Sequence, residues 1–342
     1  MDTPRSLEMF QGSVQAEMRR LLAGHNLPLY DMIRYHMGWV DAAGQPTEGA
    51  VGGKGLRSTL CLLSTRAVGG DTERALPVAA SLDLVHNFSL IHDDIQDRSP
   101  ERHRRPTVWK LWGDAQAINA GDSLFTLGRL AIYGLLQHDL SAEKVLKIER
   151  TMDETCLRLV EGQYLDLVYE SRLDITEEDY QTMIGGKTAA LMETSCYLGA
   201  FVGTEDPVIA QCFKDAGRHL GYAFQIRDDV LGIWGQAAEM GKPVAEDIYN
   251  RKKTLPAVYA LAHTEGRLRQ ELHDTYLEET VSDAGAQRAL EIFDVIGARS
   301  YAQTVAERHQ QAAIEALERT GLPQGELAPL KELARFAVER EF

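Results

Sequence analysis

The segment Leu82–Asp97 reads LDLVHNFSLIHDDIQD, a largely apolar run that ends in a cluster of acids. Its composition predicts a helix that packs into a core. On a helix, Asp93 and Asp97 lie one turn apart and point to the same side, so two carboxylates converge at the end of the helix. The segment therefore predicts a buried helix with an acidic site at its C-terminal end.

The rest of the chain has the same helical character. Apolar residues recur at spacings of three and four in Val145, Ile148, Met152, Cys156 and Leu159. Alternating β-branched runs are absent, and the 342 residues contain only 11 prolines. We expect an all-α protein with a single domain over residues 1–342. Breaks between helices are predicted near Asp41, Arg98, Gly203, Gly235 and Gly321, and none has the length or composition of an interdomain linker.

Composition and charge exclude some classes of function. The formal net charge of −15 argues against a protein that binds the nucleic-acid backbone, which needs a dominant basic face. The four cysteines have no metal-ligand spacing and are expected to be buried and unpaired. Neither a signal peptide nor a run of about 18 apolar residues is present, so we expect no membrane span and a cytoplasmic location.

A second acidic motif, Phe224–Asp229 with the sequence FQIRDD, ends another apolar helix about 135 positions later. Like charges at such a site repel unless a cation joins them. Mg²⁺ commonly uses one or two carboxylates and lets substrate phosphates complete its octahedron. Each motif alone could be a solvated helix end. Two of them predict opposed walls of a cavity that hold a diphosphate through shared metal ions.

Several motifs in order resemble the trans-isoprenyl diphosphate synthases, also called polyprenyl synthetases. They span about residues 52–256 and are DDIQD at 93–97, PT at 106–107, GD at 121–122, GQYLD at 162–166, GGKTAAL at 185–191, FQIRDD at 224–229 and KKTLP at 252–256. The resemblance implies an antiparallel helical bundle around a central cavity, and a homodimer. It also implies head-to-tail condensation of isopentenyl diphosphate with an allylic diphosphate, with three Mg²⁺ ions when substrate is bound.

The resemblance also assigns basic and polar residues to the two substrates. Lys54 and Arg57 lie on one face at the start of a helix, where free N–H groups also favour phosphate. With His86 and Arg102 they would hold isopentenyl diphosphate, and Phe224 would lie near the carbocation. The lysines aimed at the allylic diphosphate would be Lys187, Lys242 and Lys252. The polar residues lining the same cavity would be Gln163, Asp166, Thr188 and Gln225.

The chain departs from the family pattern at two positions. Gly232 stands where many members have a third aspartate of the second motif, so Asp228 is expected to be the direct metal ligand with Asp93 and Asp97. Asp94 and Asp229 are expected to complete the catalytic acids, with Asp229 acting through water. His103 replaces an arginine that would contact the five-carbon substrate, and histidine lacks the bidentate guanidinium fork. Either Arg104 or Arg105 could take that role.

Residues before the first acidic motif are expected to set product length, because they lie one or two turns down an apolar tunnel. These are Val85, Phe88 and Ser89. A phenylalanine five places before the motif, with a small serine at four, resembles the synthases that make the C20 product, and C15 is the alternative. Two other functions stay open: a terpene cyclase, favoured by His103 and Gly232, and a non-catalytic partner subunit of a prenyl synthase.

Overall fold

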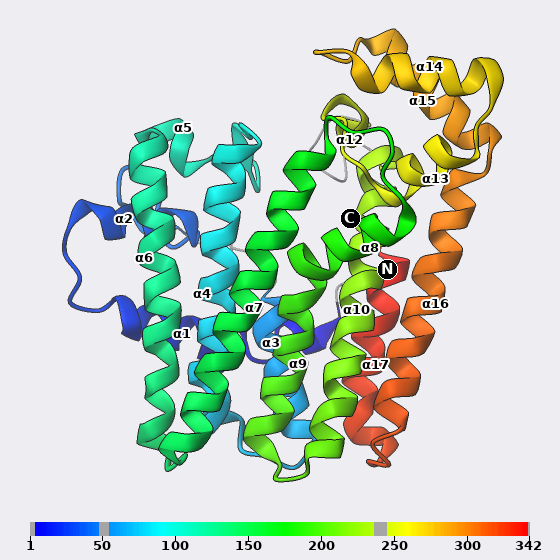
Figure 1. Ribbon diagram of the computed structural model, residues 1–342. Helices are drawn as coiled ribbons and strands as arrows, with labels where there is room; N and C mark the ends of the chain where they lie inside the picture. The colour runs from blue at the N-terminus through cyan, green and yellow to red at the C-terminus, as the bar shows by residue number, and fades with distance from the viewer. Residues whose placement is uncertain (1–3, 48–54, 236–244, 341–342) are drawn as a thin grey trace. The chain divides into compact units, whose positions relative to one another are not determined.

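The computed structural model describes residues 4–47, 55–235 and 245–340 (Figure 1). The chain divides into two compact units. The N-terminal unit comprises Thr3–Asp153 with Ser195–Ala210, and the C-terminal unit comprises Glu154–Thr194 with Gln211–Phe342. In the described ranges nearly all regular structure is helical, apart from one short hairpin and an isolated bridge between Val40 and Pro46. The all-α prediction is confirmed, and the single domain stays a prediction.

The N-terminal unit is built on the long helix α4 (Thr72–Gln96), which packs against α3 (Leu56–Ala67) and α6 (Asp114–Ile132) (Figure 1). Its other elements, in chain order, are η1 (Arg5–Leu7), α1 (Gln11–Leu22), α2 (Pro28–His36), β1 (Glu101–Arg102), β2 (Arg105–Pro106), α5 (Val108–Trp112), η2 (Tyr133–His138), the first part of α7 (Ala142–Tyr169), the second part of α9 (Ala190–Gly203) and the start of α10 (Pro207–Trp234).

Helix α4 is the predicted core helix. Asp71 caps its N-terminus by accepting a hydrogen bond from the Glu73 N–H, which satisfies one of the free donors there. Buried side chains lie all round the helix rather than on one stripe, as expected for a helix surrounded by others. Gly128 of α6 allows close approach, since a Cβ there would lie 3.0 Å from the Val85 side chain. The apolar helix thus holds its acidic C-terminal end in a fixed place.

The C-terminal unit has a helical core of its own, in which α13 packs against α8 and α16, and α16 against α17. Its elements are the second part of α7, α8 (Glu177–Ile184), the π-helical turn η3 (Gly185–Ala189), the first part of α9 (Ala190–Gly203), most of α10 (Pro207–Trp234), α12 (Glu246–Tyr249), α13 (Leu255–His263), α14 (Gly266–Leu277), α15 (Asp283–Val295), α16 (Ala298–Glu318) and α17 (Gln324–Glu339).

The predicted breaks agree with the helix ends. Gly203 ends α9, and Gly321 lies between α16 and α17. Near Arg98 the chain leaves α4 and forms the β1–β2 hairpin, which is too short to be seen as a strand pattern in the sequence. All four cysteines are buried and free, as predicted. Among the described helices, none combines the length and the apolar character needed to cross a membrane.

Candidate functional site

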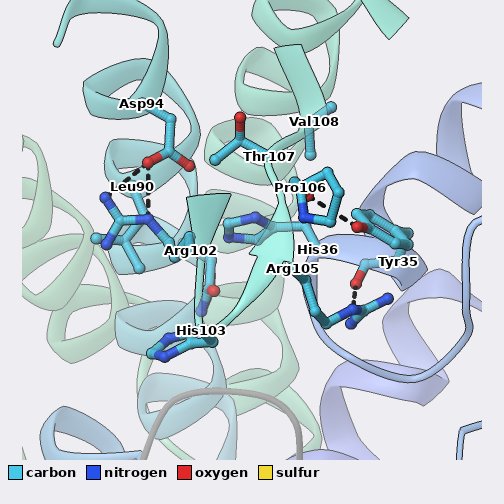
Figure 2. A pocket seen from close by; sticks show the side chains of 11 residues that line it. Tyr35, His36, Leu90, Asp94, Arg102, His103, Arg105, Pro106, Thr107 and Val108 are labelled. Atoms are coloured by element: carbon cyan, nitrogen blue, oxygen red, sulfur yellow. Dashed lines mark hydrogen bonds and ion pairs between the residues drawn. The ribbon is translucent and has the colours of Figure 1, made fainter. Parts of the chain in front are cut away.

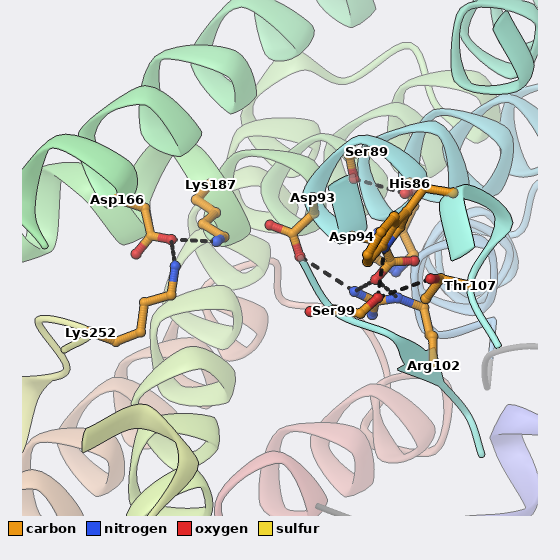
Figure 3. A network of polar contacts seen from close by, with 11 residues as sticks. His86, Ser89, Asp93, Asp94, Ser99, Arg102, Thr107, Asp166, Lys187 and Lys252 are labelled. Carbon is orange, nitrogen blue, oxygen red and sulfur yellow. Dashed lines mark hydrogen bonds and ion pairs between the residues drawn. The ribbon is translucent and has the colours of Figure 1, made fainter. Parts of the chain in front are cut away.

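The first acidic motif forms an ion-pair cluster with Arg102. The Arg102 guanidinium contacts Asp94 Oδ1 at 2.8 Å and Asp93 Oδ2 at 3.4 Å (Figure 3). Asp94 is only 2% exposed, and burial raises its pKa to about 6 against the opposing effect of Arg102. The Asp93 side chain keeps 22% exposure, and Asp97 forms the C-cap of α4. Asp93 is therefore the more accessible of the two carboxylates that Arg102 contacts, whereas Asp94 is buried and fixes Arg102.

The β1–β2 hairpin carries Arg102 and is fastened to α2. Its register pairs Arg102 with Arg105, so His103 and Arg104 form the two-residue turn, with φ of 53° and 60°. Non-glycine residues at these angles are strained, by roughly 1 kcal/mol or more each. The Arg105 guanidinium lies 4.0 Å above the Tyr35 ring and donates to the carbonyls of Tyr35 and Val40. Arg105 therefore anchors the hairpin, which leaves His103 or the exposed Arg104 to meet a ligand.

A small cavity of about 30 Å³ lies between α2, α4 and the hairpin (Figure 2). Its lining carries four basic side chains, His36, Arg102, His103 and Arg105, and one acid, Asp94. Tyr35, Asn87, Leu90, Pro106, Thr107 and Val108 complete it. The predicted PT motif is thus part of this wall, and the cavity is suited to an anion in spite of the chain's negative net charge.

Arg57 and His86 belong to the same electrostatic environment. Burial holds the pKa of His86 well below its usual range, and Arg57, Arg102, His36 and His103 lower it further. The start of α3, which carries Arg57, is fixed by Ser58, whose hydroxyl donates to Asp83 at 2.6 Å. Four of the residues predicted for the five-carbon substrate therefore lie near one another: Arg57, His86, Arg102 and His103. The fifth, Lys54, lies outside the described residues.

In the C-terminal unit, two predicted lysines converge on Asp166 of α7. The ammonium groups of Lys187 and Lys252 lie 2.7 and 2.9 Å from Asp166 Oδ2 (Figure 3). Burial raises the pKa of Asp166, but the two lysines outweigh it and hold the pKa below its ordinary value. Lys253, by contrast, is buried and donates to the carbonyls of Glu170 and Arg251. In the KKTLP motif, Lys252 therefore belongs to the site, whereas Lys253 holds the neighbouring backbone in place.

The π-helical turn η3 places Lys187 against α7. A Cβ at Gly162 would lie 2.1 Å from the backbone nitrogen of Lys187, and one at Gly186 would lie 2.4 Å from the Arg158 carbonyl oxygen. Only glycine permits this backbone contact between α7 and η3. Single π turns inside helices occur frequently at functional sites. The glycines of GQYLD and GGKTAAL are therefore needed to bring Lys187 within reach of Asp166.

Asp229 is an internal anchor. It accepts hydrogen bonds from the Tyr180 hydroxyl at 2.6 Å, from the Gln225 amide at 3.0 Å and from the Leu255 N–H at 2.9 Å. Burial raises its pKa to about 7. Thr188 donates to the other end of Gln225, which extends this network to η3. Within the structure Asp229 thus joins α8, α10 and α13 and is only 4% exposed.

Asp228 lies beside Asp229 in the chain but in different surroundings. Its side chain is 40% exposed, and its Oδ1 accepts from Arg340 at 2.5 Å. The Arg340 guanidinium also lies 3.8 Å above the Phe224 ring and donates to the Phe224 carbonyl. Arg227 donates to the Arg340 carbonyl and holds it there. The motifs found in the sequence end at about residue 256, so Arg340 was not predicted as a basic partner of the second motif.

Gly232 has a structural counterpart in Asp247. A Cβ at Gly232 would lie 2.0 Å from Asp247 Oδ2, so the Asp247 carboxylate occupies the space beside the glycine. Asp247 also raises the pKa of Asp229, which places its charge near the second motif. A third aspartate at position 232 would collide with this carboxylate. The departure from the family pattern therefore comes with an acid from α12 at the same place.

The acidic residues fit a metal that shares its coordination with a ligand. In the ranges that the structure describes, no three His, Cys, Asp or Glu side chains are grouped so as to hold a metal ion by themselves. Asp93 and Asp228 are both partly exposed, and each has a cationic partner that a metal ion would replace. Mg²⁺ binds in this way, through one or two carboxylates with water and phosphate oxygens.

The predicted chain-length residues lie along α4. Val85 is 1% and Phe88 9% exposed, and the Ser89 hydroxyl donates to the His86 carbonyl. Phe88 packs edge to face against Phe125 of α6 at 5.2 Å. Phe125 was not predicted, because no motif marks it and only the packing of α4 on α6 brings it there. Gln163 lies on α7 and Lys242 lies outside the described residues.

Comparisons with known proteins agree with this geometry. The polyprenyl synthetase family model matches residues 42–293. The (2E,6E)-farnesyl diphosphate synthase of Mycobacterium tuberculosis is 38% identical over 91% of this chain and 86% of its own. The geranylgeranyl diphosphate synthase of the same organism is 37% identical over 91% and 87%. The crystal structure of a polyprenyl synthetase from Streptomyces coelicolor superposes with a TM-score of 0.89 and 34% identity, over 98% of this chain and 99% of that one. The chain belongs to the polyprenyl synthetase family and has its all-α fold.

Proposed function

We propose that this protein condenses isopentenyl diphosphate with an allylic diphosphate, head to tail and in trans geometry, to a short-chain prenyl diphosphate. The observation that carries the proposal is Arg102, which pairs with Asp93 and Asp94 of the first motif and lines a cavity with three other basic side chains. Arg102 thus lies between the cavity proposed to bind a diphosphate and the acidic motif proposed to bind a metal ion. The farnesyl and geranylgeranyl diphosphate synthases among its relatives support the same substrate class.

The five-carbon substrate would bind in the N-terminal unit. Arg57, His86, Arg102 and His103 would hold its diphosphate, and the hairpin anchored by Arg105 keeps two of them in place. Fixing this substrate at attack distance turns a bimolecular encounter into a reaction within one complex, which is a large part of the rate enhancement available to such enzymes.

The allylic diphosphate would be held by Lys187 and Lys252, together with Lys242. Asp166 keeps two of these ammonium groups together, so they are oriented before the ligand arrives. Positive charge aimed at the departing diphosphate stabilises the negative charge that develops in the transition state. The Phe224 ring already has a guanidinium 3.8 Å above its face, and by the same interaction it could stabilise an allylic cation.

We further propose dependence on Mg²⁺, three ions in the substrate complex, with Asp93, Asp97 and Asp228 as ligands. Bound Mg²⁺ would neutralise and orient the leaving diphosphate. Asp94 and Asp229 serve as positioning residues, because each is buried and engaged by neighbouring donors. The pairs of Asp93 with Arg102 and of Asp228 with Arg340 would open as the metal binds.

The product is proposed to be C20 or C15. Phe88 and Phe125 form an aromatic contact on the part of α4 that precedes the first motif, and the adjacent Ser89 has a small side chain. The bulk of these two rings would limit the length of the prenyl product.

A homodimer is proposed from exposed apolar side chains. On α7 they recur at helical spacing in Leu157, Val160, Tyr164 and Val168. On α6 and η2 the exposed set is Ile118, Leu130, Tyr133 and Leu136. A cytoplasmic location also stays a prediction.

Incubation of the purified chain with Mg²⁺, isopentenyl diphosphate and dimethylallyl, geranyl or farnesyl diphosphate tests the function. We expect elongated prenyl diphosphates and released pyrophosphate, with no partner protein added. Hydrocarbon formed from farnesyl or geranylgeranyl diphosphate alone would instead identify a terpene cyclase. Activity that appears only after a second prenyl synthase subunit is added would identify a partner subunit.

A further inference from the structure

His36 is the one basic residue of the cavity that no motif predicts and the proposed function does not use. It is the last residue of α2, and its imidazole lies among Arg102, Thr107 and Pro106 in Figure 2. The neighbouring Tyr35 is tied to the hairpin in both directions. Its hydroxyl donates to the Pro106 carbonyl at 2.8 Å, and its own carbonyl accepts from Arg105. The end of α2 is therefore fixed against the hairpin, and His36 is held where it lines the cavity.

The Nε2 atom of His36 is buried and has no hydrogen-bond partner among the residues that the structure describes. Most buried polar atoms are paired, so an unpaired one at the wall of a polar cavity indicates a missing ligand or water. Acidic partners do not explain it, since Asp94 is the only acid among the described residues of the lining and is bound by Arg102. The space of about 30 Å³ accommodates about two waters. A phosphate oxygen that displaced them would meet Nε2.

The electrostatics of the ring suit a neutral donor. Burial lowers the pKa of His36 to about 3, and the charges of Arg102, His103 and Arg105 act in the same direction, whereas a hydrogen bond with Asn87 opposes them. A neutral imidazole has one N–H and one acceptor nitrogen, and an amide such as Asn87 can pair with either form. When the proton is on Nε2, the ring can donate to an anion without bringing a further full charge into the basic cavity.

We propose that His36 is a further binding residue for the diphosphate of the five-carbon substrate, with Nε2 donating to a phosphate oxygen beside Arg102 and His103. The identification of the substrate rests on the proposed function, whereas binding of a diphosphate at His36 does not. The geometry gives His36 a specific purpose. His103 supplies one ring nitrogen where a guanidinium fork would supply two donors, and His36 adds a second donor from α2 to the same cavity.

Two substitutions and one control separate this role from a structural one. His36→Leu removes the donor but keeps an apolar side chain of similar bulk, and His36→Gln restores an N–H near the position of Nε2. His25→Leu is the matched control, because His25 precedes the same helix and stacks on Tyr30 without lining the cavity. Melting temperatures of all variants establish that they are folded.

Calorimetric titration with isopentenyl diphosphate, and separately with inorganic pyrophosphate, measures binding without turnover. We expect His36→Leu to weaken binding of both about tenfold or more, as for loss of a hydrogen bond to a charged group. His36→Gln should stay within about threefold of the wild type, and His25→Leu should be unchanged. In steady state, His36→Leu should raise KM for isopentenyl diphosphate by a similar factor and leave KM for the allylic diphosphate unchanged.

The outcomes are distinguishable. Equal affinity of folded His36→Leu and wild type for both ligands would overturn the assignment and leave Nε2 as a water site. An equal rise of both KM values, or no recovery in His36→Gln, would also overturn it in favour of a structural role. If the wild type bound isopentenyl diphosphate through His36 but made no elongated product, the proposed function would fail and the binding residue would stand.

Discussion

Restoring the third aspartate of the second acidic motif should harm the protein. In Gly232→Asp, the new Cβ would lie 2.0 Å from Asp247 Oδ2 and 2.7 Å from its Cγ, where ordinary contacts begin near 3.4 Å. Overpacking of this kind costs about 1–3 kcal/mol. Two carboxylates forced together would add about 1 kcal/mol at the partly exposed site. For a chain of this size, the sum corresponds to a fall in melting temperature of roughly 3–6 °C.

Differential scanning calorimetry in the presence of EDTA measures this without metal effects. Gly232→Ala carries the overlap without the charge and should lie between the wild type and Gly232→Asp. The exchange variant, Gly232→Asp with Asp247→Gly, moves the acid from α12 to α10 and should recover most of the loss. A melting temperature of Gly232→Asp equal to or above that of the wild type would refute the claim that Asp247 fills this space.

Three other predictions follow from single contacts. Asp166→Asn should lower the free energy of unfolding by about 3 kcal/mol in urea titrations, because it leaves Lys187 and Lys252 together without their shared carboxylate, and a loss below about 1 kcal/mol would contradict this. Phe88→Ala should lengthen the product by one or more five-carbon units in mass-spectrometric analysis, and an unchanged product would remove Phe88 from chain-length control. Burial and His219 lower the pKa of His309 to about 4, so the unfolded chain binds the proton first and stability should fall as pH drops from about 6.5 toward 4. At pH 5 the loss is about 1 kcal/mol after allowance for partial exposure, and urea unfolding of His309→Gln should lack it, while an equally pH-dependent variant would exclude His309 as the cause.

The sequence was sufficient for what depends on periodicity and ordered motifs. The acidic end of α4 and the all-α class could be predicted from local patterns, whereas the ion pairs of Arg102 with Asp93 and Asp94 could not. Asp93 and Asp94 are adjacent in the chain, but the Asp93 side chain is 22% exposed and the Asp94 side chain only 2%. Helical geometry indicates that neighbours point apart, while only packing decides which of them is buried.

Long-range contacts were beyond the sequence. Arg340 lies 112 positions from Asp228, and nothing in the tail of the chain marks it as the partner of an acidic motif. The Asp247 carboxylate lies beside Gly232 but comes from another helix, so the motif along α10 shows only the missing aspartate. His36 is a single histidine in an ordinary amphipathic stretch, and its place in a basic cavity depends on the hairpin that folds over it. Each is a tertiary contact with no local signature.

The central proposal is that both acidic motifs are needed for the release of pyrophosphate. Pyrophosphate release from isopentenyl and allylic diphosphates, measured for Asp93→Asn, Asp228→Asn and the double variant, tests it most directly. We predict that each single change slows the reaction at least about a hundredfold, and that the double variant is far less impaired than the product of the two effects, because residues that act as a unit are not additive. A single variant that kept the wild-type rate, or effects that simply multiplied, would contradict the account.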